Sequence, residues 1–193
     1  KNQAKRYIKK RIYDYQMYLD VQDPGISRTL LLFGKRELEH KIMLQKILRP
    51  GMTVLDIGAN IGYYAIMESQ LVGERGKVIA VEPSPNNISL LTRNLQLNRC
   101  ENVEVFQAAI SDTNDEREFF MAHSSNLNTF HNTGSGAHDL TGETITVTTM
   151  TVVDMMKNSG TPDLIRMDVE GHEVEVINGM LSAIQRNELA PMI

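Results

Sequence analysis

Short apolar runs alternate with stretches of helical periodicity along most of the chain after residue 50. Apolar runs of four or five residues, such as 78–81, are typical of strands buried on both faces of a parallel sheet. In chain order we expect strand 53–56, helix 64–71, strand 77–81, helix 86–97, strands 103–108, 118–121 and 144–149, helix 152–157, strand 163–167 and helix 173–184. This alternation predicts an α/β fold, with a doubly wound parallel sheet and helices on both faces.

The first 49 residues follow a different pattern. Apolar side chains recur every three or four positions over residues 1–20, which predicts an amphipathic helix. This helix is expected to pack on the domain or on a second copy of it, and a homodimer through it is possible; the alternative is a basic element for an anionic partner. A turn at 23–25 and a helix over 37–48 follow. The predicted organisation is a helical extension, 1–49, on a catalytic unit, 50–193.

Two further segments shape the expected architecture. Residues 191–193 resemble the start of a fifth strand, so the sheet is expected to continue in sequence beyond Ile193, which would leave the unit incomplete at its C-terminal side. Residues 122–143 are rich in Ser, Asn, Thr, Gly and His. A polar stretch of this length is either a surface loop or a lid over a binding site.

Composition narrows the range of partners. The formal charge is −4, with 41% hydrophobic and 23% charged residues, which is typical of a globular protein without general attraction to nucleic acid. No apolar run approaches the ~20 residues of a membrane span. The single cysteine, Cys100, cannot form an intramolecular disulfide. A cytoplasmic protein with no nucleic-acid partner is therefore expected.

A glycine-rich turn follows the first predicted core strand. Asp56, Gly58, Asn60 and Gly62 are spaced as Asp-x-Gly-x-Asn-x-Gly, which differs from the Gly-x-Gly-x-x-Gly of dinucleotide-binding proteins. Glycine allows a sharp turn and close approach of a ligand, and the following helix directs free N–H groups toward it. The turn therefore predicts a pocket for a nucleotide-like cofactor.

Acidic residues stand at the ends of the other predicted strands. Glu82 ends the second strand, where a carboxylate can accept hydrogen bonds from both hydroxyls of a ribose. Asp112 follows the third strand and could contact an adenine amino group or only cap a turn. Asp168 and Glu170 follow the fourth strand, with His172 after them. Because ligands bind beyond the carboxyl ends of parallel strands, these side chains predict one shared site.

Three motifs together resemble the FkbM-type family of class I S-adenosylmethionine-dependent methyltransferases. They are Asp-Ile-Gly-Ala-Asn-Ile-Gly-Tyr at 56–63, Glu-Pro-Ser-Pro at 82–85, and Ile-Arg-Met-Asp-Val-Glu-Gly-His-Glu at 165–173, with Asn-Gly at 178–179. The resemblance implies a Rossmann-like fold, S-adenosylmethionine as cofactor, and O-methylation, often of a sugar or polyketide hydroxyl. By position, residues 56–62 with Tyr63 would surround the methionine part, Glu82 with Pro83 the ribose, and Ala109 with Asp112 the adenine.

The resemblance also places the segment 168–172 against the donor methyl group and the acceptor. An alcohol is a weak nucleophile at neutral pH, so O-methylation benefits from a base or a metal ion. His172 or Glu170 is the candidate general base, with Asp168 near the sulfonium or orienting the base. The alternative is Mg²⁺ on Asp168 and Glu170, with further ligands such as His131 or His138; we favour a site without metal.

The polar segment 122–143 offers groups that suit a hydroxylated small-molecule or glycan acceptor. Amides and imidazoles both donate and accept hydrogen bonds, and the segment carries Asn126, Asn128, His131 and His138. Two alternatives to a methyltransferase remain open from the residues alone. One is an NAD-dependent oxidoreductase on the same fold, and the other is a cofactor-binding module without catalysis.

Overall fold

A parallel sheet of four strands forms the centre of the protein in a computed structural model that describes residues 6–132, 137–186, 188–189 and 192–193. Its order is β5-β4-β3-β9, and each neighbouring pair is parallel. The strands are β3 (Thr53–Ile57), β4 (Lys77–Val81), β5 (Val103–Phe106) and β9 (Leu164–Met167). The sheet confirms the predicted α/β class, and all four strands lie where the apolar runs placed them.

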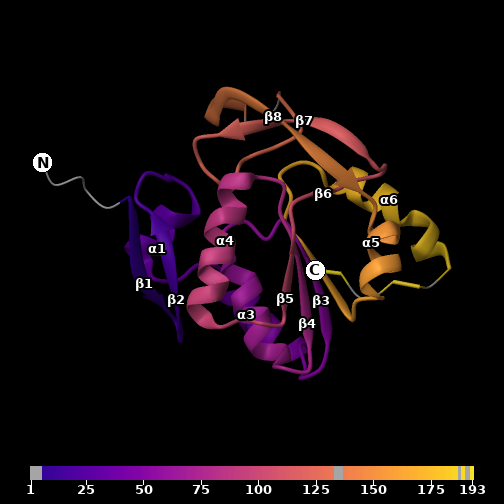
Figure 1. Cartoon of the computed structure of the whole chain (residues 1–193), viewed down its shortest axis with the longest axis horizontal. Coiled ribbons are helices and arrows are strands. Elements are labelled where there is room, and N and C mark those ends of the chain that lie inside the picture. Colours follow the sequence, from indigo (N-terminus) through magenta and orange to yellow (C-terminus); the bar gives the residue numbers. More distant parts are fainter. Residues whose placement is uncertain (1–5, 133–136, 187, 190–191) are drawn as a thin grey trace, which may run out of the picture.

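Helices cover both faces of this sheet (Figure 1). The helices α3 (Tyr63–Val72) and α4 (Pro85–Asn98) lie on one face, and α5 (Val152–Ser159) and α6 (Glu173–Gln185) on the other. Alternate residues of each strand face opposite sides. Val54 therefore joins the core under α3 and α4, whereas Leu55 packs with residues of α5 and α6.

The last described residues pair with β9. Met192 forms a parallel bridge with Ile165, and the backbone N–H of Ile193 donates to the carbonyl of Ile165 at 2.9 Å. This contact agrees with the prediction that a fifth strand begins here.

The N-terminal segment is a β-hairpin, so the predicted helix over residues 1–20 is wrong for the part that the structure describes. Strands β1 (Tyr7–Ile12) and β2 (Tyr15–Asp20) are antiparallel. Alternate residues of β2, Tyr15, Met17 and Leu19, are buried, which is the period of a strand. The hairpin lies beside α4 of the same chain (Figure 1), so the described residues of this segment do not form the helix invoked for a homodimer.

Two asparagine side chains of α4 hold this hairpin in place by hydrogen bonds to the backbone of β2. The Asn94 amide accepts from the Tyr18 N–H at 2.7 Å and donates to the Tyr18 carbonyl at 3.2 Å. Asn98 bonds Gln16 in the same two-way manner, at 3.0 and 2.7 Å. Each amide thus satisfies the exposed edge of β2 as a neighbouring strand would.

Two helices connect the hairpin to the central sheet. The helix α1 (Ile26–Phe33) was not predicted, and α2 (Leu38–Ile47) matches the expected helix over 37–48 within a residue at each end. The division of the chain at residue 49 stays a prediction. In the part of the chain that the structure describes, no helix has the length and apolarity needed to cross a bilayer.

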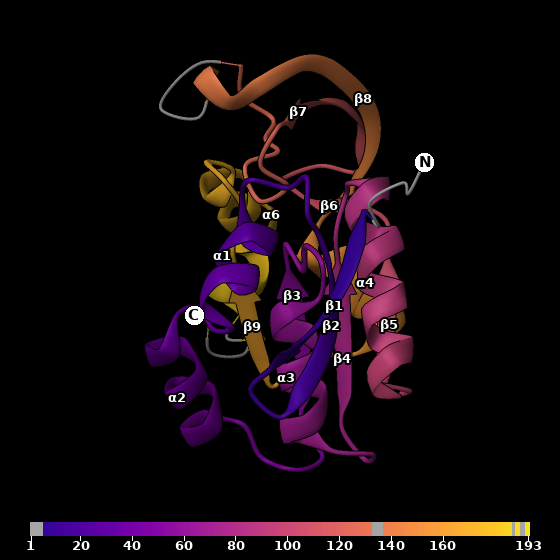
Figure 2. The ribbon, with the colours of Figure 1, turned by 90° about the vertical axis from the view of Figure 1, so that its left-hand side faces the viewer.

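A second, three-stranded sheet lies beyond one end of the central sheet (Figures 1 and 2). Its order is β6-β8-β7, formed by β6 (Ala109–Ile110), β7 (Asp115–Ala122) and β8 (Leu140–Met150). The polar segment 122–143 connects β7 to β8 and includes the 3₁₀ helix η1 (Ala137–Asp139). Thr129 bridges back to Phe120, which holds the first part of this segment over the ends of the central strands.

Candidate active site

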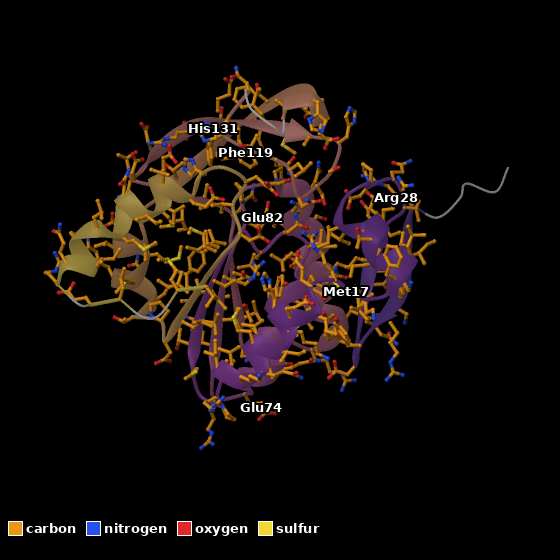
Figure 3. All side chains as sticks on the ribbon, turned by 180° about the vertical axis from the view of Figure 1, so that it is seen from behind. Met17, Arg28, Glu74, Glu82, Phe119 and His131 are labelled. Carbon is orange, nitrogen blue, oxygen red and sulfur yellow. The ribbon has the colours of Figure 1, made fainter. Side chains whose placement is uncertain are left out.

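A cavity opens at the carboxyl ends of β3, β4 and β9, beneath the second sheet. It encloses about 880 Å³ of atom-free space, a volume that includes its open mouth. Figure 3 shows Glu82 between the central sheet and the second sheet, which carries Phe119. The cavity is lined by residues of the glycine turn, the end of β4, the loop after β9 and the segment after β7.

The glycine turn forms one wall and packs directly on the loop after β9. Gly58 has φ +83°, and a Cβ built there would lie 2.1 Å from the carbonyl oxygen of Asp168. Any larger residue would therefore separate these two segments of the site. The side-chain amide of Asn60 donates to the Ser125 carbonyl at 3.0 Å, which ties the turn to the segment after β7.

Glu82 is buried at the end of β4 and lines the cavity. Its Oε2 accepts from the Asn60 N–H at 2.9 Å, and its Oε1 accepts from the Ser84 N–H at 3.0 Å and the Asn87 amide at 3.1 Å. A carboxylate has about four acceptor positions, so Oε2 keeps one for a ligand. Burial raises the pKa of Glu82 to about 7, against the opposing effect of these hydrogen bonds.

Asp56 does not line the cavity, although its motif predicts a role in cofactor binding. It is fully buried in β3, and its Oδ1 forms an ion pair with Arg166 Nη1 at 2.7 Å. Burial raises the pKa of Asp56, and the Arg166 charge opposes that shift. The acid at the head of the motif therefore belongs to an internal charge network.

Gly62 is also absent from the cavity lining and packs instead against Leu91, while the next residue, Tyr63, lines the cavity. Gly62 has φ +89°, and its left-handed conformation starts α3.

The internal charge network extends from Asp56 to the cavity. Arg166 Nη2 donates to Asp168 Oδ2 at 2.8 Å, and the guanidinium lies over the Tyr64 ring at 3.8 Å. Glu68 is fully buried nearby, and burial followed by the Asp56 charge raises its pKa well above the ordinary value. Asp56 and Asp168 both bond Arg166, whereas none of the described residues bonds the Glu68 carboxyl.

The loop after β9 brings the predicted acidic residues to the cavity. Asp168, Glu170 and His172 all line it. Burial, followed by the charges of Asp168 and Glu173, raises the pKa of Glu170. None of the described residues forms a hydrogen bond or an ion pair with the Glu170 carboxylate, which is therefore free to take a proton from a ligand.

His172 differs from its two neighbours because its ring nitrogens face the protein. Its Nε2 lies 3.0 Å from Ser111 Oγ, and its Nδ1 lies 3.5 Å from Glu175 Oε2. The ring stacks near Phe130, with centroids 4.3 Å apart. Burial lowers the pKa of His172, which keeps the imidazole neutral at neutral pH.

One of the two predicted adenine contacts lines the cavity. Ala109 does so, as does Pro83 next to Glu82, whereas Asp112 does not. The Asp112 carboxylate accepts from Ser111 Oγ at 3.1 Å and from Arg117 Nη2 at 2.7 Å. Asp112 therefore bonds two side chains outside the cavity, and both of its predicted roles stay predictions.

The segment after β7 supplies two of the four predicted substrate residues. Asn126 and Asn128 line the cavity, but His131 and His138 do not. His138 is exposed on η1. Residues 133–136, which belong to the predicted lid, lie outside the described residues.

Several lining residues were not identified from the sequence. Arg36 follows α1, Asn87 and Tyr64 lie in helices, and Thr129 and Phe130 precede His131. The first three are brought to the cavity by helix packing and carry no motif. The last two lie inside the polar segment, where an aromatic residue between Thr and His was the available signal.

The sequence of the chain is similar to those of known methyltransferases. A family model described as "Methyltransferase FkbM domain" matches residues 56–189. The hexuronic acid methyltransferase AglP of Haloferax volcanii is 27% identical over 134 residues, covering 67% of this chain and 50% of that protein. A protein-L-isoaspartate O-methyltransferase of Methanothrix thermoacetophila is 41% identical over 58 residues, covering 30% of this chain and 28% of that protein.

Among solved structures, a precorrin-6y C5,15-methyltransferase from Geobacter metallireducens aligns with a TM-score of 0.45 at 16% identity. The alignment covers 73% of this chain and 54% of that one. The chain thus spans half or less of the length of the two curated relatives described above.

Proposed function

The chain belongs to the FkbM methyltransferase family, and we propose that it transfers a methyl group from S-adenosylmethionine to a hydroxyl of a sugar or glycan. The family match covers the glycine turn, Glu82 and the loop after β9 in one stretch. It gives no support to the alternative of an NAD-dependent oxidoreductase.

One observation carries the proposal: a single cavity joins a ribose-type carboxylate to an acidic loop. Glu82 retains an acceptor position on Oε2, and the small residues Gly58 and Ala109 leave room beside it. These groups fit the adenosine part of S-adenosylmethionine. Asp168 and Glu170 line the same cavity, and the acceptor would lie beside them.

The bound cofactor would supply an electrophilic methyl group that is already activated by the positive sulfonium. The protein must then align the acceptor and remove its proton. Glu170 fits the base role best, because its carboxylate has a raised pKa and no partner among the described residues. Asp168 is held by Arg166 at 2.8 Å, which would fix its carboxylate near the sulfonium.

Part of the cavity lining is polar. It includes Arg36, Asn126, Asn128 and Thr129, and such groups suit hydroxyls and ring oxygens. AglP, named as a hexuronic acid methyltransferase, is the relative above that matches two thirds of this chain, which supports a sugar acceptor. The isoaspartate methyltransferase matches 30% of the chain, so its acceptor carries less weight.

The proposal is tested by supplying the full chain with S-adenosylmethionine and separate sets of acceptors. The first set contains sugars and uronic acids, the second glycans, the third isoaspartyl peptides and the fourth RNA. Mass spectrometry identifies the methylated product. We expect methyl ethers on the sugar or glycan set. Methylation confined to peptide or RNA would overturn the proposed acceptor. Cofactor binding with no transfer to any set would favour the non-catalytic alternative.

Glu82→Gln should weaken binding of S-adenosylmethionine by roughly 10–100-fold, because a hydrogen bond to a charged group contributes about 1.5–3 kcal/mol. In the wild type the affinity should rise with pH up to about 7, as Glu82 ionises. Calorimetry between pH 6 and 8 measures both effects. The variant should lack this pH dependence.

The matched control is Asp112→Asn, at the predicted adenine contact that lies away from the cavity. It should leave cofactor affinity within about twofold. Equal losses in the two variants would contradict the assignment of Glu82.

The free energy of unfolding of the unliganded protein should decrease as the pH rises from 4.5 to about 7. The reason is that Glu82 loses its proton at a lower pH in the unfolded chain than in the folded one.

A further inference from the structure

Three buried side-chain atoms without hydrogen-bond partners among the described residues meet beside the cavity. They are His131 Nε2, His172 Nδ1 and Glu175 Oε2. The three residues each offer a ligand atom, and these atoms all lie within 4.8 Å of one another. Leaving several polar groups unsatisfied in one place is costly, so their convergence requires a physical reason.

The surroundings of His172 define which nitrogen is available. Its Nε2 is 3.0 Å from Ser111 Oγ, and the Ser111 hydroxyl is itself 3.1 Å from Asp112 Oδ1. If Ser111 donates to the Asp112 carboxylate, its oxygen accepts the proton of His172 Nε2. The lone pair of Nδ1 then points toward Glu175 Oε2 at 3.5 Å. Two acceptors that face one another in this way repel unless a cation lies between them.

We propose that His131, His172 and Glu175 bind a Zn²⁺ ion. Two imidazoles and one carboxylate form a ligand set that zinc accepts, with a fourth position left for water. Tetrahedral zinc with bonds of about 2.0–2.2 Å places its ligand atoms about 3.4 Å apart. The 3.5 Å between His172 and Glu175 already meets this spacing.

The ligands come from two separate parts of the fold. His172 immediately precedes α6 and Glu175 lies in its first turn, whereas His131 lies in the segment after β7 (Figure 3). Because the widest pair of ligand atoms is within 4.8 Å, the His131 ring needs only a small inward movement. The ion would therefore connect the segment after β7, which lines the cavity, to the start of α6.

The Ser111 hydroxyl acts as a positioning group for this site. Ligand histidines generally donate their second N–H to a neighbouring oxygen, and loss of that partner weakens metal binding by about 10–100-fold. Ser111→Ala should show this loss. Glu170, the base assigned above, lies outside the ligand set, so the proposal does not depend on methyl transfer.

The test uses the full chain, stripped of metal by chelation and then dialysed against zinc sulfate. Elemental mass spectrometry should find one zinc per chain, and competition with a chromophoric chelator should give its affinity. His131→Asn and Glu175→Gln should each weaken zinc by about 100-fold or more, because loss of a ligand exceeds loss of its outer-shell partner. Zinc should raise the melting temperature of the wild type but not of these variants.

Two matched variants separate this site from non-specific binding. His123 and Glu173 are exposed residues of the same types in the same two parts of the fold, and His123→Asn and Glu173→Gln should bind zinc as the wild type does. Failure of the wild type to retain zinc would overturn the proposal and would favour a proton shared by His172 and Glu175. Equal weakening by the control variants would overturn it too.

Discussion

Replacing Glu170 by glutamine should lower the rate of methyl transfer by about 10²–10⁴-fold, the usual contribution of a general base. Glutamine keeps the size of the side chain but cannot accept a proton. Binding of S-adenosylmethionine should be unchanged, because the proposal assigns the cofactor to Glu82 and only proton removal to Glu170. Single-turnover assays with saturating cofactor measure the chemical step.

The pH profile distinguishes a base from a residue that only shapes the site. In the wild type the rate should rise with pH through the pKa of Glu170, which is raised by burial and then by Asp168. The glutamine variant should lack this rise. Glu116→Gln, an exposed control on β7, should retain both the rate and the profile. An unchanged profile in Glu170→Gln would assign the proton transfer to another group.

Replacing Arg166 by methionine should lower the free energy of unfolding by about 3–5 kcal/mol, since it leaves buried charge without its partner. Asp56 has no exposure and keeps Oδ1 bonded only to Arg166, at 2.7 Å. The substitution also removes the cation–π contact with Tyr64. Urea unfolding at pH 7.5 measures the change.

Two further variants separate charge from packing in this experiment. Arg166→Met combined with Asp56→Asn should recover part of the loss, because the unpaired carboxylate is gone. Arg186→Met removes an exposed pair with Glu188, and it should leave the free energy of unfolding close to that of the wild type, because exposed ion pairs contribute little to stability. The loss in Arg166→Met should shrink as the pH falls, since protonation of Asp56 neutralises the stranded charge. A loss below 1 kcal/mol would contradict the network.

The central sheet could be predicted because its signal is local. Runs such as 78–81 are apolar at every position, and only a strand buried on both faces requires that. The sequence also placed Glu82, Asp168 and Glu170 at one end of the sheet, because parallel strands bring their carboxyl ends together. The fold and the acidic end of the candidate site therefore follow from short-range patterns.

The hairpin was mispredicted because two periodicities overlap in the same residues. Ile8 and Ile12 fit a helical stripe, but Ile8 is 46% exposed. Tyr15, Met17 and Leu19 alternate instead, and that period was the correct one. Asn94 and Asn98, which bond β2, lie more than 70 residues away, so no local pattern could reveal them.

Long-range pairing also explains why Asp56 was assigned to the cofactor. Its motif resembles a ligand-binding turn, but its role depends on Arg166, which lies 110 residues later on the neighbouring strand β9. The grouping of His131 with His172 and Glu175 has the same origin. Contacts between residues that are far apart in the sequence determine which acidic and imidazole side chains line a ligand site and which bond one another. A local sequence pattern does not contain this information.

The hydrogen bonds between the hairpin and α4 join parts of the chain that the ribosome synthesises at different times. Gln16 and Asn98 are 82 residues apart, which a ribosome covers in roughly 4–16 s at about 5–20 residues per second. An isolated two-stranded hairpin has little stability of its own in water. During nascent-chain elongation the first strands must therefore wait, exposed to chaperones and proteases, until their helical partner emerges.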